Sequence, residues 1–195
     1  LNEFQLQAMN EINRQFTEKP VVLLHGITSS GKTEIYIQLI DKVIASGKQV
    51  LYLVPEIALT TQLTSRLKRI FGKRLGVYHS RFSDAERVEI WNNVLHDKSY
   101  DVIIGVRSSV FLPFRQLGLV IVDEEHENSY KQYDPAPRYN ARNSAIVLAS
   151  MHGAKTLLGT ATPAIETYYN AQTGKYGYVE LNQRFQEMEL PDILI

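Results

Sequence analysis

The sequence predicts an α/β fold, with a mainly parallel sheet that carries helices on both faces. Short apolar runs of strand length alternate with segments whose apolar residues recur at helical spacing. This alternation is typical of parallel strands joined by right-handed helical crossovers. Two of the runs, 101–105 and 119–123, are rich in β-branched residues, as strands buried on both faces are. The length of 195 residues suits one domain of this class.

Local patterns place the individual elements. Residues 1–14 are expected to form a helix with Asn2 as its N-cap and with Leu6, Met9 and Ile12 on one face. The other helices are expected at 35–46, 60–71, 83–97, 141–152 and 163–171. The strands are expected at 21–24, 49–54, 75–78, 101–105, 119–123, 156–159 and 177–181.

Composition excludes several classes of protein. Lys and Arg together number 21, as do Asp and Glu, so no global basic field indicates nucleic acid. The chain has no cysteine, which argues against a disulfide framework or a thiolate metal site. The apolar runs are far shorter than the ~20 residues that span a bilayer, so we expect a cytoplasmic protein without a membrane partner. The start without Met and the strand-like end at 192–195 suggest a piece of a larger multidomain protein.

The stretch 25–33 fits the phosphate-loop pattern G-x-x-x-x-G-K-[ST]. Its glycines let the backbone curl around phosphate oxygens, and the following helix adds its positive N-terminal end. We expect Lys32 to meet the β- and γ-phosphates of ATP and the Thr33 hydroxyl to ligate Mg²⁺. The expected phosphate-binding residues are Gly26, Thr28, Ser29, Ser30, Gly31, Lys32 and Thr33. The alternative is a glycine-rich entry to an ordinary helix.

Acidic residues follow the apolar run 119–123 directly. Asp123 at the carboxyl end of this strand can hold Mg²⁺ through the hydration shell of the ion. Glu124 can orient and deprotonate an attacking water. Lys32, Asp123 and Glu124 are therefore the expected catalytic residues, against the alternative of a helix start enriched in acids. His126 is either a coupling residue or an ordinary loop histidine.

Two hydroxyls follow a third predicted strand. Thr160 and Thr162 either sense the γ-phosphate and couple it to a second ligand, or Thr162 simply caps a helix before Pro163.

The loop at 128–140 interleaves aromatic and cationic residues. These are Tyr130, Lys131, Tyr133, Arg138 and Tyr139. Such loops hold single-stranded nucleic acid by base stacking, worth ~1–3 kcal/mol per base, and by contacts to phosphates. The alternative is that two of the three tyrosines pack the loop onto the core. A basic cluster at 66–74 is expected to be a solvated helix face.

Together these motifs resemble superfamily 2 helicases of the DEAH-like type, and more narrowly the bacterial primosomal replication-restart helicases, the PriA family. The segments that carry the resemblance are 25–34, 79–80, 105–111, 117–126, 129–132, 138–142 and 159–163. The resemblance implies that 1–195 is the first RecA-like, ATP-binding lobe of such a helicase. We expect two departures from the family pattern, Ser30 in place of glycine and Asn143 in place of aspartate.

The resemblance also implies roles for further residues. Gln5 would read the adenine edge, and Arg107 and Ser108 would lie along single-stranded DNA, as would the segment 54–60. The aromatic loop would couple DNA engagement to ATP hydrolysis, and a second lobe would add an arginine finger.

The implied activity is that of an ATP-dependent 3′→5′ DNA helicase at stalled forks. Its implied partners are single-stranded and forked DNA, primosome proteins and single-strand-binding proteins, with zinc held only in a part of the protein outside this chain. Three alternatives remain open. The chain could belong to another superfamily 2 DNA translocase such as a restriction-type motor, to a nucleotide-gated docking module, or to a nucleotide kinase.

Overall fold

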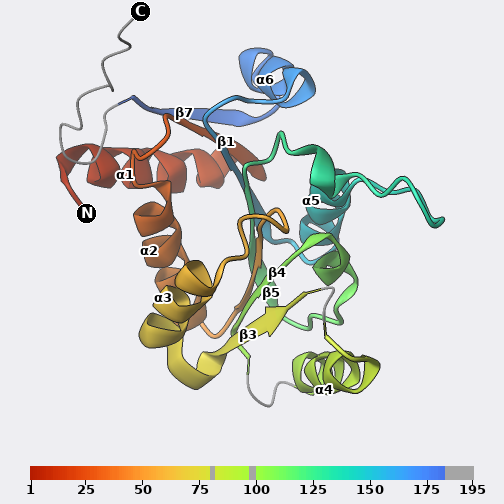
Figure 1. The fold of residues 1–195 in the computed structure, drawn as a ribbon. Coiled ribbons are helices and arrows are strands. Elements are labelled where there is room, and N and C mark those ends of the chain that lie inside the picture. The colour runs from red at the N-terminus through yellow and green to blue at the C-terminus, as the bar shows by residue number, and fades with distance from the viewer. Residues whose placement is uncertain (80–81, 97–99, 183–195) are drawn as a thin grey trace, which may run out of the picture.

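The computed structural model describes residues 1–79, 82–96 and 100–182, and Figure 1 shows its fold. Seven strands in this part form one sheet in the order β3-β4-β2-β5-β6-β1-β7. Every pairing between neighbouring strands is parallel. The predicted α/β fold with a mainly parallel sheet is therefore confirmed. The stretch at 192–195, expected to begin a strand, lies outside the described residues.

The described part contains every strand and helix that the sequence predicts, with ends shifted by a few residues. The strands are β1 (Val21–Gly26), β2 (Gln49–Leu53), β3 (Leu75–Tyr78), β4 (Val102–Gly105), β5 (Leu117–Asp123), β6 (Lys155–Thr160) and β7 (Gly177–Leu181). The α-helices are α1 (Glu3–Glu18), α2 (Lys32–Ala45), α3 (Thr61–Phe71), α4 (Asp84–Leu95), α5 (Ala141–Met151) and α6 (Ile165–Gln172). Short 3₁₀ helices are η1 (Gly72–Arg74), η2 (Arg107–Phe111) and η3 (Asn128–Tyr130). Among the described residues, no helix is both long enough and apolar enough to cross a membrane.

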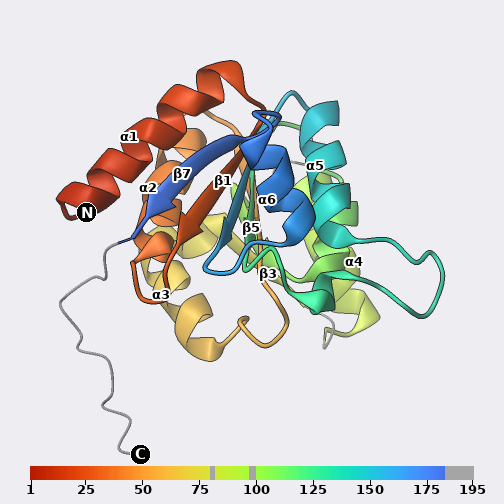
Figure 2. The ribbon, with the colours of Figure 1, turned by 90° about the horizontal axis from the view of Figure 1, so that it is seen from above.

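An apolar core lies on each face of the sheet. Helices α1, α2 and α3 cover one face, and α4, α5 and α6 cover the other (Figure 2). Successive residues of β1 alternate between the cores, because side chains of a strand point to opposite faces. Val22 and Leu24 belong to the core under α1–α3, whereas Val21 and Leu23 belong to the core under α4–α6. Burial on both faces explains the near-continuous apolar runs of the central strands.

Helix α1 buries a set of residues that differs in part from the predicted one. Asn2 caps it as predicted and forms a capping box with Gln5. The buried residues of α1 are Gln5, Ala8 and Ile12. Leu6, which we expected on the buried face, is 46% exposed. The helix is turned so that the buried Gln5 amide donates to the Ser30 carbonyl at 3.2 Å, a polar contact that the apolar pattern does not reveal.

Helix α6 begins later than the sequence predicts. Its first residue is Ile165 and Ala164 occupies the N-cap position, so Thr162 does not cap this helix. The backbone N–H of Ala164 instead donates to the Glu125 carboxylate at 2.7 Å. A side chain from the end of β5 therefore satisfies a free N–H at the start of α6, and the alternative in which Thr162 is an N-cap is wrong.

Candidate nucleotide-binding site

The phosphate loop, residues 26–33, connects β1 to α2 at the carboxyl edge of the sheet. Lys32 is the first residue of α2, and its ammonium donates to the Gly26 carbonyl at 2.8 Å. A Cβ on Gly26 would lie 3.2 Å from Cγ of Lys32 and 3.0 Å from Oγ of Ser30. The missing side chain at Gly26 therefore lets the lysine and the serine approach the loop closely.

The backbone of the loop shows which of its positions favour glycine. Left-handed conformations occur at Ser29, with φ of 63°, and at Gly31, with φ of 81°, but not at Ser30. Only glycine adopts this conformation without strain, so Ser29 occupies the position that favours glycine. The Ser30 hydroxyl is buried and has no hydrogen-bond partner within the described residues.

Asp123 ends β5 and is held by two tyrosines. The Tyr36 hydroxyl donates to its Oδ1 at 3.0 Å, and the Tyr52 hydroxyl donates to its Oδ2 at 3.2 Å. Burial and the neighbouring Glu124 carboxylate raise the pKa of Asp123 to about 6, although Tyr36, Lys32 and Tyr52 act in the opposite direction. The same burial and the Asp123 charge raise the pKa of both tyrosines well above the usual value, so both remain hydrogen-bond donors.

A glycine on the neighbouring strand makes room for this arrangement. Gly159 lies on β6, paired with Asp123 in the parallel register. A Cβ at this position would lie 1.8 Å from the Tyr36 hydroxyl oxygen. Gly159 is therefore required for the contact between Tyr36 and Asp123.

The residues around the loop fit a magnesium ion that arrives with a nucleotide. Asp123 offers a carboxylate, and Thr33, which follows Lys32 in α2, offers a hydroxyl. No group of three or more His, Cys, Asp or Glu side chains converges on a metal position in the described part of the chain. Mg²⁺ typically keeps several waters and binds through one or two protein oxygens plus phosphate, and Asp123 and Thr33 offer two such oxygens.

Glu124 connects the phosphate loop to β6. Its Oε1 lies 3.8 Å from Nζ of Lys32, and its Oε2 accepts from the Thr160 hydroxyl at 3.4 Å. The Thr160 oxygen in turn lies 2.7 Å from Nδ1 of His126 and accepts from the Thr162 backbone N–H at 3.1 Å. The structure thus joins Lys32, Glu124, His126 and both threonines in one network.

Glu125 is a structural residue that the sequence reading missed. Its carboxylate is 1% exposed, and Arg142 donates to it at 2.9 Å. The Thr167 hydroxyl donates to the same carboxylate at 2.8 Å, in addition to the Ala164 N–H. Glu125 therefore ties the end of β5 to the start of α5 and to α6. The sequence signal for this role is weak: Glu125 is the third acidic residue in succession, and the expected binding of Mg²⁺ and activation of water need only the first two.

The aromatic loop protrudes from the sheet between β5 and α5 (Figure 2). Tyr130 is an exception, because it is buried and its hydroxyl donates to the Asp123 carbonyl at 2.6 Å. Tyr130 therefore packs the loop onto the core, as the alternative for two of the three tyrosines expects, and its part in DNA contact or coupling stays a prediction. Tyr133 is 68% exposed, and Tyr139 packs edge-to-face on Phe111 at 4.9 Å between ring centroids.

The two cations of this loop brace its backbone. Nε of Arg138 donates to the Tyr133 carbonyl at 2.8 Å, and Lys131 donates to the Arg138 carbonyl. Arg107 of η2 donates to the carbonyls of Ser129 and Lys131 at 3.3 and 3.2 Å. A small hollow of about 130 Å³ lies where Arg107, Ser108 and the loop meet the segment after β2. The structure thus brings the aromatic loop together with the two segments that the resemblance places along DNA.

Gln5 lies apart from the acidic residues. Its side-chain oxygen accepts from the Asn2 N–H at 2.9 Å, and its amide group bonds to Ser30 of the phosphate loop. The predicted contact of Gln5 with an adenine edge stays a prediction, but its burial against the loop excludes the ordinary solvated glutamine.

Comparison with known sequences identifies the family. The profile of the DEAD/DEAH box helicases matches residues 2–171. The chain is 46% identical over 176 residues to the replication restart protein PriA of Bacillus subtilis, covering 90% of this chain and 22% of that protein. It is 47% identical over 195 residues to PriA of Rickettsia felis, covering 100% of this chain and 29% of that protein. The chain thus spans less than a third of the length of these relatives.

Solved structures show the same fold. RecG bound to a three-way DNA junction superposes with a TM-score of 0.68 at 23% identity, over 97% of this chain and 25% of RecG. The DUF1998 helicase MrfA bound to DNA gives a TM-score of 0.66 at 19% identity, over 94% of this chain and 26% of MrfA. At these identities the likeness concerns the fold alone, which is the predicted RecA-like helicase lobe. The chain therefore belongs to the DEAD/DEAH box helicase family.

Proposed function

We propose that this chain is the first RecA-like lobe of a PriA-like helicase, and that it binds ATP and Mg²⁺ to drive 3′→5′ unwinding of DNA at stalled forks. One observation carries the proposal. Lys32, Asp123 and Glu124 converge at the carboxyl edge of the sheet, with Lys32 and Glu124 3.8 Å apart. A cation next to a water-orienting carboxylate and a second carboxylate for the metal is what phosphoryl transfer to water requires.

Each residue would have a distinct task. Bound Mg·ATP supplies the phosphoryl group and the charge of the metal. Lys32 would leave the Gly26 carbonyl to bind the β- and γ-phosphates, while Thr33 and Asp123 would hold the hydrated ion. Glu124 would orient the attacking water, and Thr160 would transmit the state of Glu124 to His126 and Thr162. Tyr36 and Tyr52 would keep the Asp123 carboxylate in one orientation.

The longer protein would supply the remaining parts. An arginine finger from a second lobe would complete the site, so we expect this chain alone to bind nucleotide but to hydrolyse it slowly. Rapid turnover by the chain alone would contradict this view. We further propose single-stranded and forked DNA, primosome proteins and single-strand-binding proteins as partners in the cytoplasm, with zinc held outside this chain.

A binding measurement tests the nucleotide site. A fluorescent ATP analogue with Mg²⁺ should bind the wild-type chain and lose at least about tenfold in affinity with Lys32→Ala, because a charge-assisted contact worth about 1.5–3 kcal/mol disappears. Lys175→Ala, which removes a cation that lies over the Tyr176 ring, is the matched control and should bind normally. Equal affinity of Lys32→Ala and wild type would exclude the proposed site.

A docking module gated by nucleotide is the second candidate. It would share ATP binding but would not need water activation. Glu124→Gln in the longer protein distinguishes the two candidates. If the chain is a motor lobe, this variant should retain nucleotide binding but lose DNA unwinding. If the chain is a docking module, the variant should keep its function, because that function does not need water activation.

A further inference from the structure

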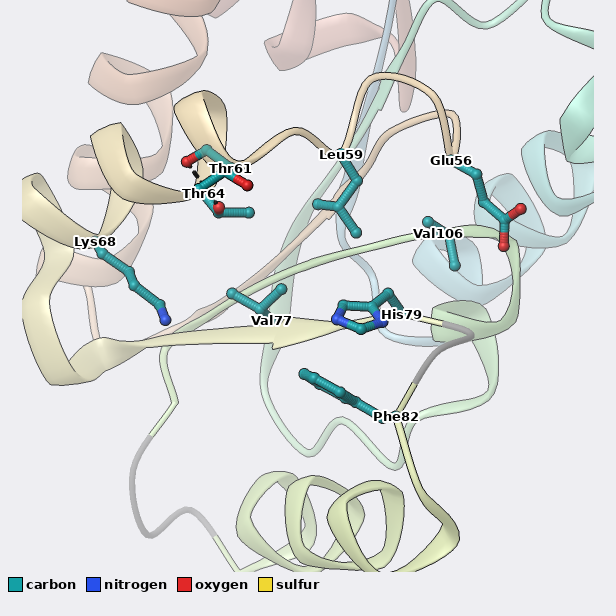
Figure 3. Close-up of a pocket in the computed structure, with 9 residues that line it drawn as sticks. All are labelled: Glu56, Leu59, Thr61, Thr64, Lys68, Val77, His79, Phe82 and Val106. Atoms are coloured by element: carbon teal, nitrogen blue, oxygen red, sulfur yellow. Dashed lines mark hydrogen bonds between the residues drawn. The ribbon is translucent and has the colours of Figure 1, made fainter.

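A polar cluster lies at the edge of the sheet that β7 forms, centred on His25 of β1. It is separate from the hollow of about 390 Å³ in Figure 3, which is lined by Glu56 and Leu59 of the segment 54–60 that the resemblance places along DNA. His25 is half-buried and directly precedes Gly26 of the phosphate loop. None of the tasks proposed for the nucleotide site involves the His25 side chain.

Both nitrogens of the His25 ring have partners. Nε2 lies 3.2 Å from the carbonyl oxygen of Ala161. Ala161 is the middle residue of the coupling segment, which we define as residues 160–162 and whose two threonines belong to the Glu124 network. Nδ1 lies 2.9 Å from the hydroxyl oxygen of Tyr178 on β7. His25 therefore links the end of β1, where the phosphate loop begins, to the coupling segment on one side and to β7 on the other.

Tyr178 connects the His25 ring to a carboxylate. Its hydroxyl donates to Oε1 of Glu180 at 2.7 Å, and the Asn182 amide donates to Oε2 at 3.0 Å. These two hydrogen bonds lower the pKa of Glu180, so its carboxylate is ionised at neutral pH. The Tyr178 ring also packs edge-to-face on Tyr168 of α6, with 6.1 Å between ring centroids. The groups around His25 are thus Tyr178 and Glu180 from β7, Tyr168 from α6 behind Tyr178, and a carbonyl after β6.

The hydrogen bonds of the cluster depend on the charge of the His25 ring. A carbonyl oxygen only accepts, so Nε2 must donate in the bond to Ala161. An ionised carboxylate also only accepts, so the single hydroxyl proton of Tyr178 lies toward Glu180 in their bond. Nδ1 can then bond to the Tyr178 oxygen only as a donor. All three bonds therefore exist together only when the ring carries both protons, and in a neutral ring one of them is lost.

We propose that His25 is a positioning residue whose charged ring, anchored by Tyr178 and Glu180, holds the coupling segment beside the phosphate loop. Histidine ordinarily changes its charge between pH 5 and 8. Loss of the ring proton releases one bond, so the coupling segment transmits the state of Glu124 less effectively. The coupling between nucleotide and DNA is thus stronger at lower pH. The inference rests on the proposed function and deepens it, because it adds a pH-dependent residue to the coupling path.

Nuclear magnetic resonance follows the charge of the ring directly. In a chain with isotope-labelled histidine, the chemical shifts of the ring nitrogens distinguish the doubly protonated ring from a neutral one, and the signal absent from His25→Gln identifies His25. In Glu180→Gln and in Tyr178→Phe the ring should lose its second proton at a pH about 0.2–0.7 units lower than in wild type, because the anionic partner or the link to it is gone. Titration at the same pH in all three chains would overturn the inference.

The pH dependence of coupling gives a second, independent measurement. The affinity for a single-stranded deoxyoligonucleotide is measured at pH 6 and pH 8, with and without a non-hydrolysable ATP analogue and Mg²⁺. Asp123 titrates in the same range, with a pKa of about 6, so chains that differ only at His25 are compared. The nucleotide effect at pH 6, relative to pH 8, should be about 2- to 12-fold larger in wild type than in His25→Gln, as expected for one hydrogen bond.

Two further variants complete this measurement. His96→Gln is the matched control, since His96 is exposed at the end of α4, and it should keep the pH dependence of the wild type. Glu180→Gln changes an exposed position at which folding is not at risk, and it should reduce the pH dependence as His25→Gln does.

The outcomes separate this inference from the proposed function. Equal pH dependence in wild type, His25→Gln and Glu180→Gln would overturn the role of His25 and leave nucleotide and DNA binding by the lobe intact. A wild-type chain that binds both ligands, but whose DNA affinity nucleotide does not change at either pH, would overturn the role of His25 together with the proposed coupling. The nucleotide site itself is tested separately by Lys32→Ala.

Discussion

Gly159 and Tyr36 should be energetically coupled, and the structure sets the size of the effect. In Gly159→Ala the new Cβ would lie 1.8 Å from the Tyr36 hydroxyl oxygen and 2.9 Å from its Cζ. Tyr36 is fully buried and cannot swing into solvent. Overpacking costs about 1–3 kcal/mol, and displacement of Tyr36 from the Asp123 carboxylate costs about 1.5–3 kcal/mol more. We therefore expect Gly159→Ala to lower the free energy of unfolding by about 2.5–6 kcal/mol.

Removal of the hydroxyl should relieve most of this clash. Tyr36→Phe alone should cost about 1.5–3 kcal/mol for the lost hydrogen bond to a charged group. In the Tyr36→Phe background, Gly159→Ala meets only the ring at 2.9 Å and should cost about 1–2 kcal/mol. The double-mutant cycle should thus give a coupling energy of about 2 kcal/mol or more.

Urea unfolding of the four chains, followed by circular dichroism at pH 7.5 in the absence of nucleotide, measures this cycle. Tyr178→Phe combined with Gly159→Ala is the control, since the Tyr178 hydroxyl contacts His25 and Glu180 instead of Gly159. This control pair should be additive. Additivity within about 0.5 kcal/mol for Tyr36 and Gly159 would refute the argument that the glycine makes room for the hydroxyl.

Three further predictions concern stability. Ser29→Gly should raise the free energy of unfolding by about 0.5–1 kcal/mol, because Ser29 has a left-handed backbone conformation that strains a residue with a Cβ. Ser30→Gly should not raise it, and urea unfolding that ranks the two variants otherwise would contradict the assignment of the strained position to Ser29. The pKa of Asp123 is raised from 3.8 to about 6 in the folded chain, so the free energy of unfolding should fall as pH rises from about 4 to 6. Asp123→Asn should therefore stabilise the nucleotide-free chain by up to about 3 kcal/mol at pH 8 but little at pH 4. A stability difference between variant and wild type that does not depend on pH would refute this. Glu125→Gln should cost about 3 kcal/mol because it breaks a buried ion pair with Arg142, against under about 0.5 kcal/mol for Glu127→Gln in the same thermal or urea unfolding assay.

The sequence predicts the fold well because its signals are local. Apolar runs that are buried on both faces, and loops that follow each run, are visible without knowledge of tertiary contacts. The phosphate loop and Asp123 are equally readable, because their residue types and spacing are set by phosphate and metal chemistry. The position of these motifs at one edge then follows from the parallel sheet, since carboxyl ends of parallel strands lie together.

Contacts between distant segments could not be predicted in this way. No residue near Leu6 in the sequence indicates that the Gln5 side chain would contact Ser30. This contact goes with a rotation of α1 that buries Gln5 and leaves Leu6 of the predicted apolar face exposed. The cap of α6 comes from Glu125, which lies 39 residues away in sequence, so the local Thr162–Pro163 pattern was misleading. Tyr130 could be a base-stacking or a core residue by type alone, and only its bond to the Asp123 carbonyl decides between them.

The proposed function implies that nucleotide at the phosphate loop and DNA along the sheet edge influence each other, and we propose that they do so through Glu124, Thr160 and His126. The most direct test is the affinity of the chain for single-stranded DNA, measured by fluorescence anisotropy with and without a non-hydrolysable ATP analogue and Mg²⁺. The wild type should show a change of about 5- to 150-fold, typical of coupled sites. Thr160→Val, which keeps the shape but removes the hydroxyl, should bind each ligand nearly as well as wild type and lose most of the change. A wild-type DNA affinity that nucleotide leaves unchanged, or an equal change in Thr160→Val, would contradict the account.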